Sequence, residues 1–287
     1  MKYKFIQEQE GGLSVKRLCY ILDVSRSAYY RWQHCGLSQR ERNNQALLPL
    51  IKQIHEQSRN TYGSPRICNA LHQRGICCSR NRIAHIMRAG GIRAKTVRPY
   101  KVTTRSSVDR TFAPDLVQRN FTATEPNRVW TTDITYVWTK QGWAYLAVVL
   151  DLFSRMIVGW DLSSRLTTSL VTSAVSRAVY SRKPSEGLIL HSDRGSQYTS
   201  DKMRVFAKEQ NIKLSMGKTG SCYDNAVTES FFHTLKTEHV YFSRYNTRLD
   251  ARTSIFDYIE SFYNQHRLHS TIGNLSPVQF ELQAVFT

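Results

Sequence analysis

The texture of the sequence changes after Pro126, and this change constrains the fold more than any other feature. Three successive runs are rich in β-branched and aromatic residues and predict consecutive strands: VWTTDITYV, AYLAVVLD and RMIVGWDL. Helical periodicity over residues 167–180 and 203–210 then alternates with two shorter apolar runs that also predict strands, GLILHSD and IKLSM. Three strands followed by alternating helix and strand predict an α/β layer with a mixed five-stranded sheet.

Three acidic side chains occupy unusual places in this α/β segment. Asp133 lies inside the first predicted strand, where a charge is costly unless a partner or a metal ion compensates it. Asp193 ends the run GLILHSD, and open α/β sheets commonly bind ligands at the carboxyl ends of strands. Glu229 falls in a predicted helix that begins at Asp224, on the same face as Lys236, because seven residues make nearly two turns. The order of elements is that of ribonuclease H, whose first and fourth strands are neighbours, so the two aspartates can reach one spot.

Carboxylates gathered in this way suit metal-dependent chemistry on phosphodiesters. Cleavage and transfer of these bonds need an activated oxygen nucleophile and a stabilised leaving oxygen, and two divalent cations supply both. Magnesium in particular binds a few carboxylate oxygens and completes its shell with water and phosphate. A single aspartate at a strand end is usually a turn residue and a helical glutamate is usually solvated, so the joint pattern of Asp133, Asp193 and Glu229 carries the prediction.

Several other residues of this region have a structural interpretation. His191 shares a strand face with Asp193 and could orient a bound water, although such a histidine is more often packed. Asp151 and Asp161 end predicted strands and are interpreted as turn or cap residues. A later cluster with helical spacing is interpreted as core; its members are Tyr258, Ile259, Phe262 and Tyr263.

Positive charge is concentrated in the first part of the chain. The net charge is +18, and residues 1 to 120 contain 22 Lys and Arg against 7 Asp and Glu. Such a polarised charge attracts a polyanion, and binding through phosphates weakens as salt rises. A basic surface that serves only solubility is the alternative.

Two helical modules occupy this basic part. In the first, apolar residues line one face of a helix over 15–22, and Ser25 can cap a second, basic and aromatic helix. In the second, the string NTYGSPRI suits a helix start with Ser64 as N-cap, and Ser79 can cap a further helix that ends at Gly90. The arginines that we expect to contact DNA are Arg26, Arg31, Arg66, Arg80 and Arg82. An ordinary helical bundle with solvated arginines remains open for each module.

The predicted division of the chain follows from these patterns. It comprises a helix-turn-helix DNA-binding module (1–45), a second helical DNA-binding module (46–98), a basic linker (99–124), a ribonuclease-H-like core (125–240) and a C-terminal helical extension (241–287). No apolar run is long enough to cross a membrane, and the six cysteines include no C-x-x-C pair. A zinc site from His55, His72, Cys77 and Cys78 fits no standard finger spacing, so we expect reduced cytoplasmic thiols.

The strings that carry the three acids resemble a known family. Asp133, Asp193 and Glu229 are separated by 59 and 35 residues, and Lys236 follows seven residues later. This spacing resembles the catalytic spacing of retroviral-integrase-like DDE transposases of bacterial insertion sequences. The strings PNRVWTTDITYV, YLAVVLDLFSR, HSDRGSQYTS, GSCYDNAVTESFFHTLKTE and YIESFYNQHRLHSTIGNLSPVQF also look like that family's core, and NTYGSPRI looks like its N-terminal module. The resemblance covers nearly the whole chain and is nearest to the integrase-core product of the second reading frame.

The resemblance implies roles for individual residues and partners. The three acids would bind two Mg²⁺ ions, with Mn²⁺ as a substitute, and Lys236 would contact DNA at the site. Gln197, Tyr198 and Asn225 would stack on or hydrogen-bond an unpaired DNA end. The expected partners are double-stranded DNA of the element's terminal inverted repeats and of the target, other copies of the chain on that DNA, and the upstream-frame product, as a separate chain or a frameshift fusion. The expected place is the bacterial cytoplasm, at the nucleoid.

Two other functions are compatible with parts of the pattern. A ribonuclease-H-type nuclease or resolvase would hydrolyse DNA without joining it, but it would not need two helix-turn-helix modules. A DNA-binding regulator with an inactive core would keep the basic part, but it would have no need for an intact set of three acids. Strand joining distinguishes the first alternative from a transposase, and metal-dependent cleavage distinguishes the second.

Overall fold

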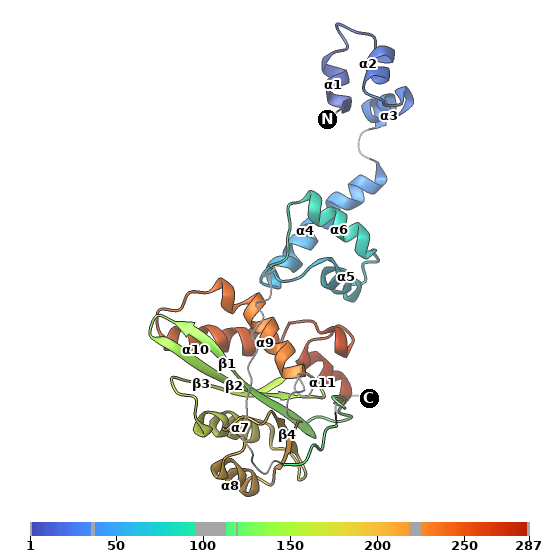
Figure 1. The fold of residues 1–287 in the computed structure, drawn as a ribbon. Coiled ribbons are helices and arrows are strands. Elements are labelled where there is room, and N and C mark those ends of the chain that lie inside the picture. The colour runs from blue at the N-terminus through green and yellow to red at the C-terminus, as the bar shows by residue number, and fades with distance from the viewer. Residues whose placement is uncertain (1, 36–37, 96–112, 119, 218–225, 286–287) are drawn as a thin grey trace. The chain divides into compact units, whose positions relative to one another are not determined.

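The computed structural model describes residues 2–35, 38–95, 113–118, 120–217 and 226–285. The chain forms two compact units, one of Met1–Gln57 with Gly63–Arg93 and one of Ser58–Tyr62 with Ala94–Thr287. The first unit is helical, and the second contains the sheet (Figure 1). Within the described residues, no helix is both long and apolar enough to cross a membrane.

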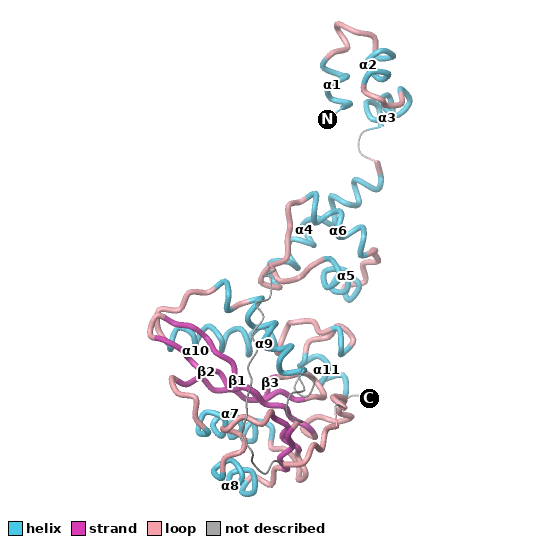
Figure 2. The backbone as a smooth tube through the Cα atoms, in the orientation of Figure 1, coloured by secondary structure: helices cyan, strands magenta, loops and turns pink. Residues whose placement is uncertain are grey.

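A five-stranded mixed sheet forms the centre of the second unit, as predicted. Its strands are β1 (Val129–Thr139), β2 (Gly142–Asp151), β3 (Ile157–Ser163), β4 (Ile189–Ser192) and β5 (Lys213–Met216). The strand order is β3-β2-β1-β4-β5, in which β1 to β3 are antiparallel and β4 and β5 are parallel to β1. Figure 2 shows the strands of the sheet in magenta. Each strand coincides with one of the five predicted runs, because β-branched and aromatic residues suit a pleated, half-buried surface.

Helices α7 (Thr168–Arg182) and α8 (Asp201–Glu209) pack against one face of the sheet through a shared apolar core. Gly159 on β3 lets α7 approach closely, because a Cβ atom at this position would lie 2.4 Å from the carbonyl oxygen of Ala174. The core includes Trp130, Val149, Val171, Ala174 and Leu190, all fully buried or nearly so. The end of the predicted linker also belongs to this unit, since Leu116 donates its backbone N–H to Ser215 Oγ at 2.9 Å.

Helix α9 (Ala226–Glu238) contacts β1, and Thr228 Oγ1 donates to Thr131 Oγ1 at 2.7 Å. The chain continues through η1 (Val240–Phe242), α10 (Arg248–Phe256), the π-helical segment η2 (Asp257–Tyr263), η3 (Ser270–Ile272) and α11 (Pro277–Val285). The predicted core cluster in η2 is confirmed, because Tyr258, Ile259, Phe262 and Tyr263 are all buried. Asn264 then joins this segment to the sheet through two 3.0 Å bonds with the backbone N–H and C=O of Ile157.

Among the described residues, the helical unit contains six helices, which include the four described from the sequence. Its helices are α1 (Lys2–Glu8), α2 (Val15–Ile21), α3 (Arg26–Cys35), α4 (Gln39–Gln57), α5 (Ser64–Gln73) and α6 (Arg80–Ala89). Helix α1 was not predicted; its buried Ile6 joins the small core of Leu18, Cys19 and Tyr29. Gly63, and not Ser64, is the N-cap of α5, whereas the expected cap of α6 is present, since Ser79 Oγ accepts from the backbone N–H of Arg82.

The expected boundary between residues 45 and 46 falls inside helix α4. A helix of this length is one continuous element, so a division before Gln39 agrees better with the helix limits. Most of the linker expected over 99–124, namely residues 99–112, lies outside the described residues.

Candidate active site

Asp133 lies on β1 just beyond the point where β4 ends. The last paired residues of these two strands are Thr131 and His191, so Asp133 and Asp193 each follow that pair by two positions. Burial, the charge of Asp193 and, more weakly, that of Glu229 raise the pKa of Asp133 to about 8. Opposing these effects are a 2.7 Å hydrogen bond from the backbone N–H of Ile134 and the charge of Lys236.

Asp193 stands at the carboxyl end of β4, where its residue is exposed. The backbone N–H of Gly195 donates to its Oδ1 at 2.9 Å. Gly195 leaves room for this close turn, because a Cβ atom there would lie 2.9 Å from Asp193 Oδ1 and 3.3 Å from Gln197 Oε1. Desolvation by the surrounding protein raises the pKa of the Asp193 carboxyl, and the Gly195 hydrogen bond lowers it.

Glu229 and Lys236 project from α9, which the Thr228 hydroxyl attaches to β1. Glu229 is exposed, and desolvation followed by the charge of Asp193 raises its pKa. Lys236 is half-buried, and burial lowers the pKa of its ammonium while the charge of Asp133 opposes that change. The fold therefore places Asp133 within electrostatic reach of Asp193, Glu229 and Lys236.

The donor set of this site fits a hard divalent cation. Carboxylate oxygens are the ligands that Mg²⁺ prefers, and these three side chains can offer six of them. Among the described residues, none of the three acids forms an ion pair, although each has a raised pKa. A bound cation would offset the mutual repulsion and the burial cost that raise these pKa values.

The predictions for three neighbours of the acids have different outcomes. Tyr198 is buried in the core of the sheet, with its hydroxyl 3.4 Å from Thr132 Oγ1, so in this structure it presents no surface for a DNA base. His191 is also buried, and its Nδ1 lies 2.9 Å from Ser215 Oγ, which favours the packed interpretation. Asn225 lies outside the described residues.

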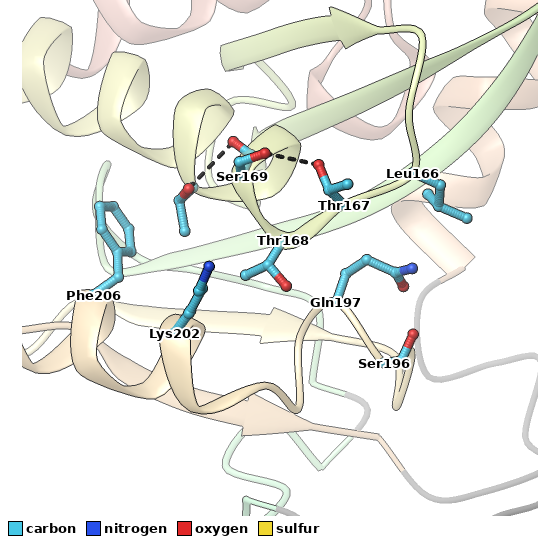
Figure 3. A pocket seen from close by; sticks show the side chains of 9 residues that line it. Leu166, Thr167, Thr168, Ser169, Ser196, Gln197, Lys202 and Phe206 are labelled. Atoms are coloured by element: carbon cyan, nitrogen blue, oxygen red, sulfur yellow. Dashed lines mark hydrogen bonds between the residues drawn. The ribbon is translucent and has the colours of Figure 1, made fainter.

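Gln197 is partly exposed and lines a polar hollow between the starts of α7 and α8 (Figure 3). Across the hollow, the Thr167 and Ser169 hydroxyl oxygens lie 2.7 Å apart, and Lys202 projects from α8. Gln197 thus remains available for a hydrogen bond to a ligand, whereas its neighbour Tyr198 does not.

The arginines expected to contact DNA fall into two groups in the helical unit. Arg26, Arg31 and Arg80 are exposed. Arg66 and Arg82 are partly buried, and Arg82 Nε donates to Asn44 Oδ1 at 2.7 Å, which joins α6 to α4. The partial burial of Arg82 therefore has a structural explanation that the helical pattern alone did not reveal.

A cluster of two cysteines and one histidine lies between α5 and α6; its His72 and Cys78 belong to the zinc set that the sequence analysis considered, and its Cys68 does not. Cys68 Sγ is 3.6 Å from His72 Nε2 and 3.8 Å from Cys78 Sγ. His72 Nε2 is already 2.7 Å from the carbonyl oxygen of Cys78, and burial raises the pKa of the Cys78 thiol to about 11. The polar atoms of this cluster thus have partners within the protein, and we assign no metal to it.

Comparisons with known proteins address both units. Two integrase core domain families match residues 123–222 and 229–285, and the HTH-like domain family matches residues 42–100. Transposase InsF for insertion sequence IS3A of Escherichia coli K12 is 38% identical over 283 residues, 98% of each chain. A protein of insertion element IS600 from Shigella sonnei, described as an uncharacterized 31 kDa protein, is 41% identical over 92% of this chain and 97% of its own length.

Solved structures show a more distant likeness. The HTLV-2 integrase catalytic core domain in complex with magnesium is 18% identical, with a TM-score of 0.42 over 55% of this chain and 98% of that chain. A chain of the simian T-cell lymphotropic virus intasome, solved with a PP2A regulatory subunit, is 17% identical, with a TM-score of 0.45 over 80% of this chain and 74% of that chain.

Proposed function

Because the chain belongs to the insertion-sequence transposase family that includes the InsF proteins of IS3, we propose that Asp133, Asp193 and Glu229 are its catalytic acids. The chain is a transposase, and its family implies polynucleotidyl transfer on DNA. In our proposal the three carboxylates hold two Mg²⁺ ions, which Mn²⁺ can replace. When bound, such a pair of cations activates an oxygen nucleophile and stabilises the leaving oxygen.

One observation carries this proposal. Three acids far apart in the sequence lie within electrostatic reach of one another, and the charges of Asp193 and Glu229 help to raise the pKa of Asp133. A structural role would be served better by paired or hydrogen-bonded carboxylates, because an uncompensated charge costs free energy. A cluster of perturbed acids at a strand end instead has the properties of a functional site.

The proposed reaction has two steps, both at the site that the three carboxylates form. Water first hydrolyses one strand at an element end, and the exposed 3′ hydroxyl then attacks another phosphodiester in line. No covalent intermediate with the protein is needed. Lys236, beside Asp133, contacts a DNA phosphate and orients it toward the acids, while Gln197 hydrogen-bonds the DNA end.

The proposed partners follow from the helical modules and their charge. The exposed Arg26, Arg31 and Arg80 contact phosphates of the terminal inverted repeats, and the core engages target DNA. We propose that several copies of the chain act together on this DNA, with the upstream-frame product separate or fused, at the nucleoid. Affinity for any DNA then falls as salt rises, with a log-log slope of about −0.9 for each phosphate contacted.

The test measures transposition and metal binding separately. An element that encodes Asp133→Asn or Glu229→Gln should transpose at background frequency, and the purified variants should bind Mn²⁺ more weakly by calorimetry. Asp201→Asn is the matched control, because that acid is 93% exposed on α8 and pairs only with Arg204 among the ion pairs of the described residues. Normal transposition and metal binding by the Asp133 or Glu229 variant would contradict the proposed role of the acids.

A further inference from the structure

A hollow of about 920 Å³ lies along the β1–β2 hairpin, beside the last turn of α9. We call it the hairpin groove. The residues that matter for its chemistry are Tyr136, Trp138, Lys140, Trp143, Lys236 and Arg244. Planar aromatic rings and cationic groups thus line one concave surface of the sheet unit.

The aromatic rings of the groove are exposed to an unusual degree. Tyr136, Trp138 and Trp143 are 50%, 58% and 50% exposed. Trp138 and Trp143 are direct cross-strand partners, with ring centroids 4.9 Å apart in an edge-to-face arrangement. Such pairs stabilise a hairpin, but this role uses only the surfaces that touch, so it does not explain why the outer halves of three large rings remain in water.

The rings are held in place by bonds at the hairpin turn. Arg248 donates to the carbonyl oxygen of Gln141 at 2.6 Å and to that of Trp143 at 3.2 Å. The backbone N–H of Lys140 donates to the carbonyl oxygen of Tyr245 at 3.0 Å. The groove is therefore preorganised, and a ligand that stacks on it loses little free energy in ordering the protein.

The charge of the groove indicates a polyanion with planar apolar groups. Lys140 and Arg244 are exposed, Lys236 lies beside them, and none of the described residues that line the groove is acidic. Lys236 also lies within electrostatic reach of Asp133, so one wall of the groove lies near the acid site. A DNA duplex keeps its base faces stacked inside, whereas a single strand offers base faces and phosphates together.

We propose that the hairpin groove binds a single DNA strand next to the acid site, with bases stacked on Trp138 and Trp143 and phosphates beside Lys140 and Arg244. The identity of the ligand as DNA, and the placement of its scissile bond, rest on the proposed function. The inference extends that function, because it identifies the groove as the surface that holds the bases of one strand after they leave the duplex.

The experiment compares two labelled strands of about 15 nucleotides, oligodeoxythymidylate and a backbone of equal length without bases, with full-length protein. Wild-type protein should bind the strand with bases about tenfold more tightly, since stacking on one aromatic ring is worth about that factor. Trp138→Ala with Trp143→Ala should remove this preference and leave affinity for the abasic strand unchanged. Tyr180→Ala is the matched control, because Tyr180 is 84% exposed on α7 and does not line the groove.

Each other outcome overturns the proposal. An unchanged preference for bases in the double tryptophan variant means that the groove does not stack them. If the double alanine variant loses affinity equally for both strands and has a lowered melting temperature, the rings only support the hairpin. In that case the variant with Trp138→Leu and Trp143→Leu, which keeps apolar contact across the hairpin, binds both strands as the wild-type protein does. Unchanged strand binding with loss of self-association in sedimentation identifies a contact between copies of the chain. Asp133→Asn separates the two proposals, because it should lose transposition and keep the base preference.

Discussion

The two ends of helix α9 each carry a glutamate, and the surroundings of these two glutamates differ. Glu229, in the first turn, is exposed and has a raised pKa next to Asp193. The side chain of Glu238, the last residue, is 10% exposed and pairs with the buried Arg267, whose guanidinium donates to both of its oxygens at 2.8 and 2.7 Å. Tyr258 donates a further hydrogen bond of 2.9 Å to Glu238.

This difference indicates that one end of α9 is fixed in the fold and that the other end is free to bind a cation. At the Glu238 end, charge is neutralised by a two-pronged ion pair, which fixes α9 against the C-terminal segment. At the Glu229 end, charge is left uncompensated at a site whose oxygens suit a cation. One helix thus carries a locked end that positions it and an open end that we propose to be catalytic.

The largest expected effect comes from Asp133→Asn. Transposition should fall by about 1,000-fold or more, because several kcal/mol of charge stabilisation is lost and each 1.4 kcal/mol is tenfold. The thermal midpoint without divalent cations should not fall, since a neutral amide avoids the free-energy cost that burial and the neighbouring acids impose on the ionised carboxyl. Added Mg²⁺ should raise the midpoint of the wild-type protein more than that of the variant. A large loss of stability in metal-free buffer would show that Asp133 stabilises the fold, as Glu238 does, and would contradict the proposed difference between the two ends of α9.

Arg267→Met should destabilise the locked end by about 3 to 5 kcal/mol, because the mostly buried carboxylate of Glu238 would lose the cation that neutralises it. Urea unfolding followed by circular dichroism measures the change. Adding Glu238→Leu should recover much of the loss, because two apolar side chains leave no buried charge. Arg128→Met is the control; its ion pair with Glu125 is exposed, so its loss should cost less than about 1 kcal/mol. Equal losses of unfolding free energy in Arg267→Met and Arg128→Met would contradict the stabilising role of the Glu238 and Arg267 pair.

Acid should weaken the locked end through His239, which follows Glu238 in the chain. Burial, together with the charge of Arg59, lowers the pKa of His239 from 6.5 to about 4. The folded pKa is below the unfolded value, so the stabilising effect is complete above pH 6.5 and is lost as pH falls toward 4. The wild-type protein should therefore lose about 3 kcal/mol more over this range than His239→Gln. Unfolding at several pH values measures this, and His266→Gln, at an exposed position, should behave as wild type.

Asn264→Ala should have the smallest effect of the four, about 2 kcal/mol, because the backbone N–H and C=O of Ile157 would lose a buried partner. The C-terminal segment would then be held less firmly to β3. Urea unfolding measures the loss, with Gln265→Ala as the exposed neighbouring control. An indistinguishable midpoint for Asn264→Ala would show that these bonds do not support the locked end.

Much of the fold could be predicted because its patterns are local. All five strand runs and α7 and α8 were located within a few residues, since β-branched content and helical periodicity are readable along the chain. Helix α1 was missed because a single apolar residue, Ile6, carries its burial. Gly159 was not singled out either, because its value lies in the space that α7 occupies.

Individual side chains were harder to place than elements. Tyr198 was expected on a DNA-facing surface and is buried, because the core beneath α7 and α8 covers its ring. The Glu238 and Arg267 pair joins residues far apart in the sequence, and no spacing rule predicts it. The hairpin groove could have been suspected from the alternation of Tyr136 and Trp138, but their exposure depends on what the neighbouring elements leave uncovered.

By itself the sequence determined most of the elements, the family resemblance and the choice of the three candidate acids, because periodicity, residue type and motif are properties of neighbouring positions. The tertiary structure alone decided which charges are neutralised and which are left open. That decision depends on distances between segments that meet only when β1, β4 and α9 pack together, and burial and mutual charge set the pKa of Asp133 only there.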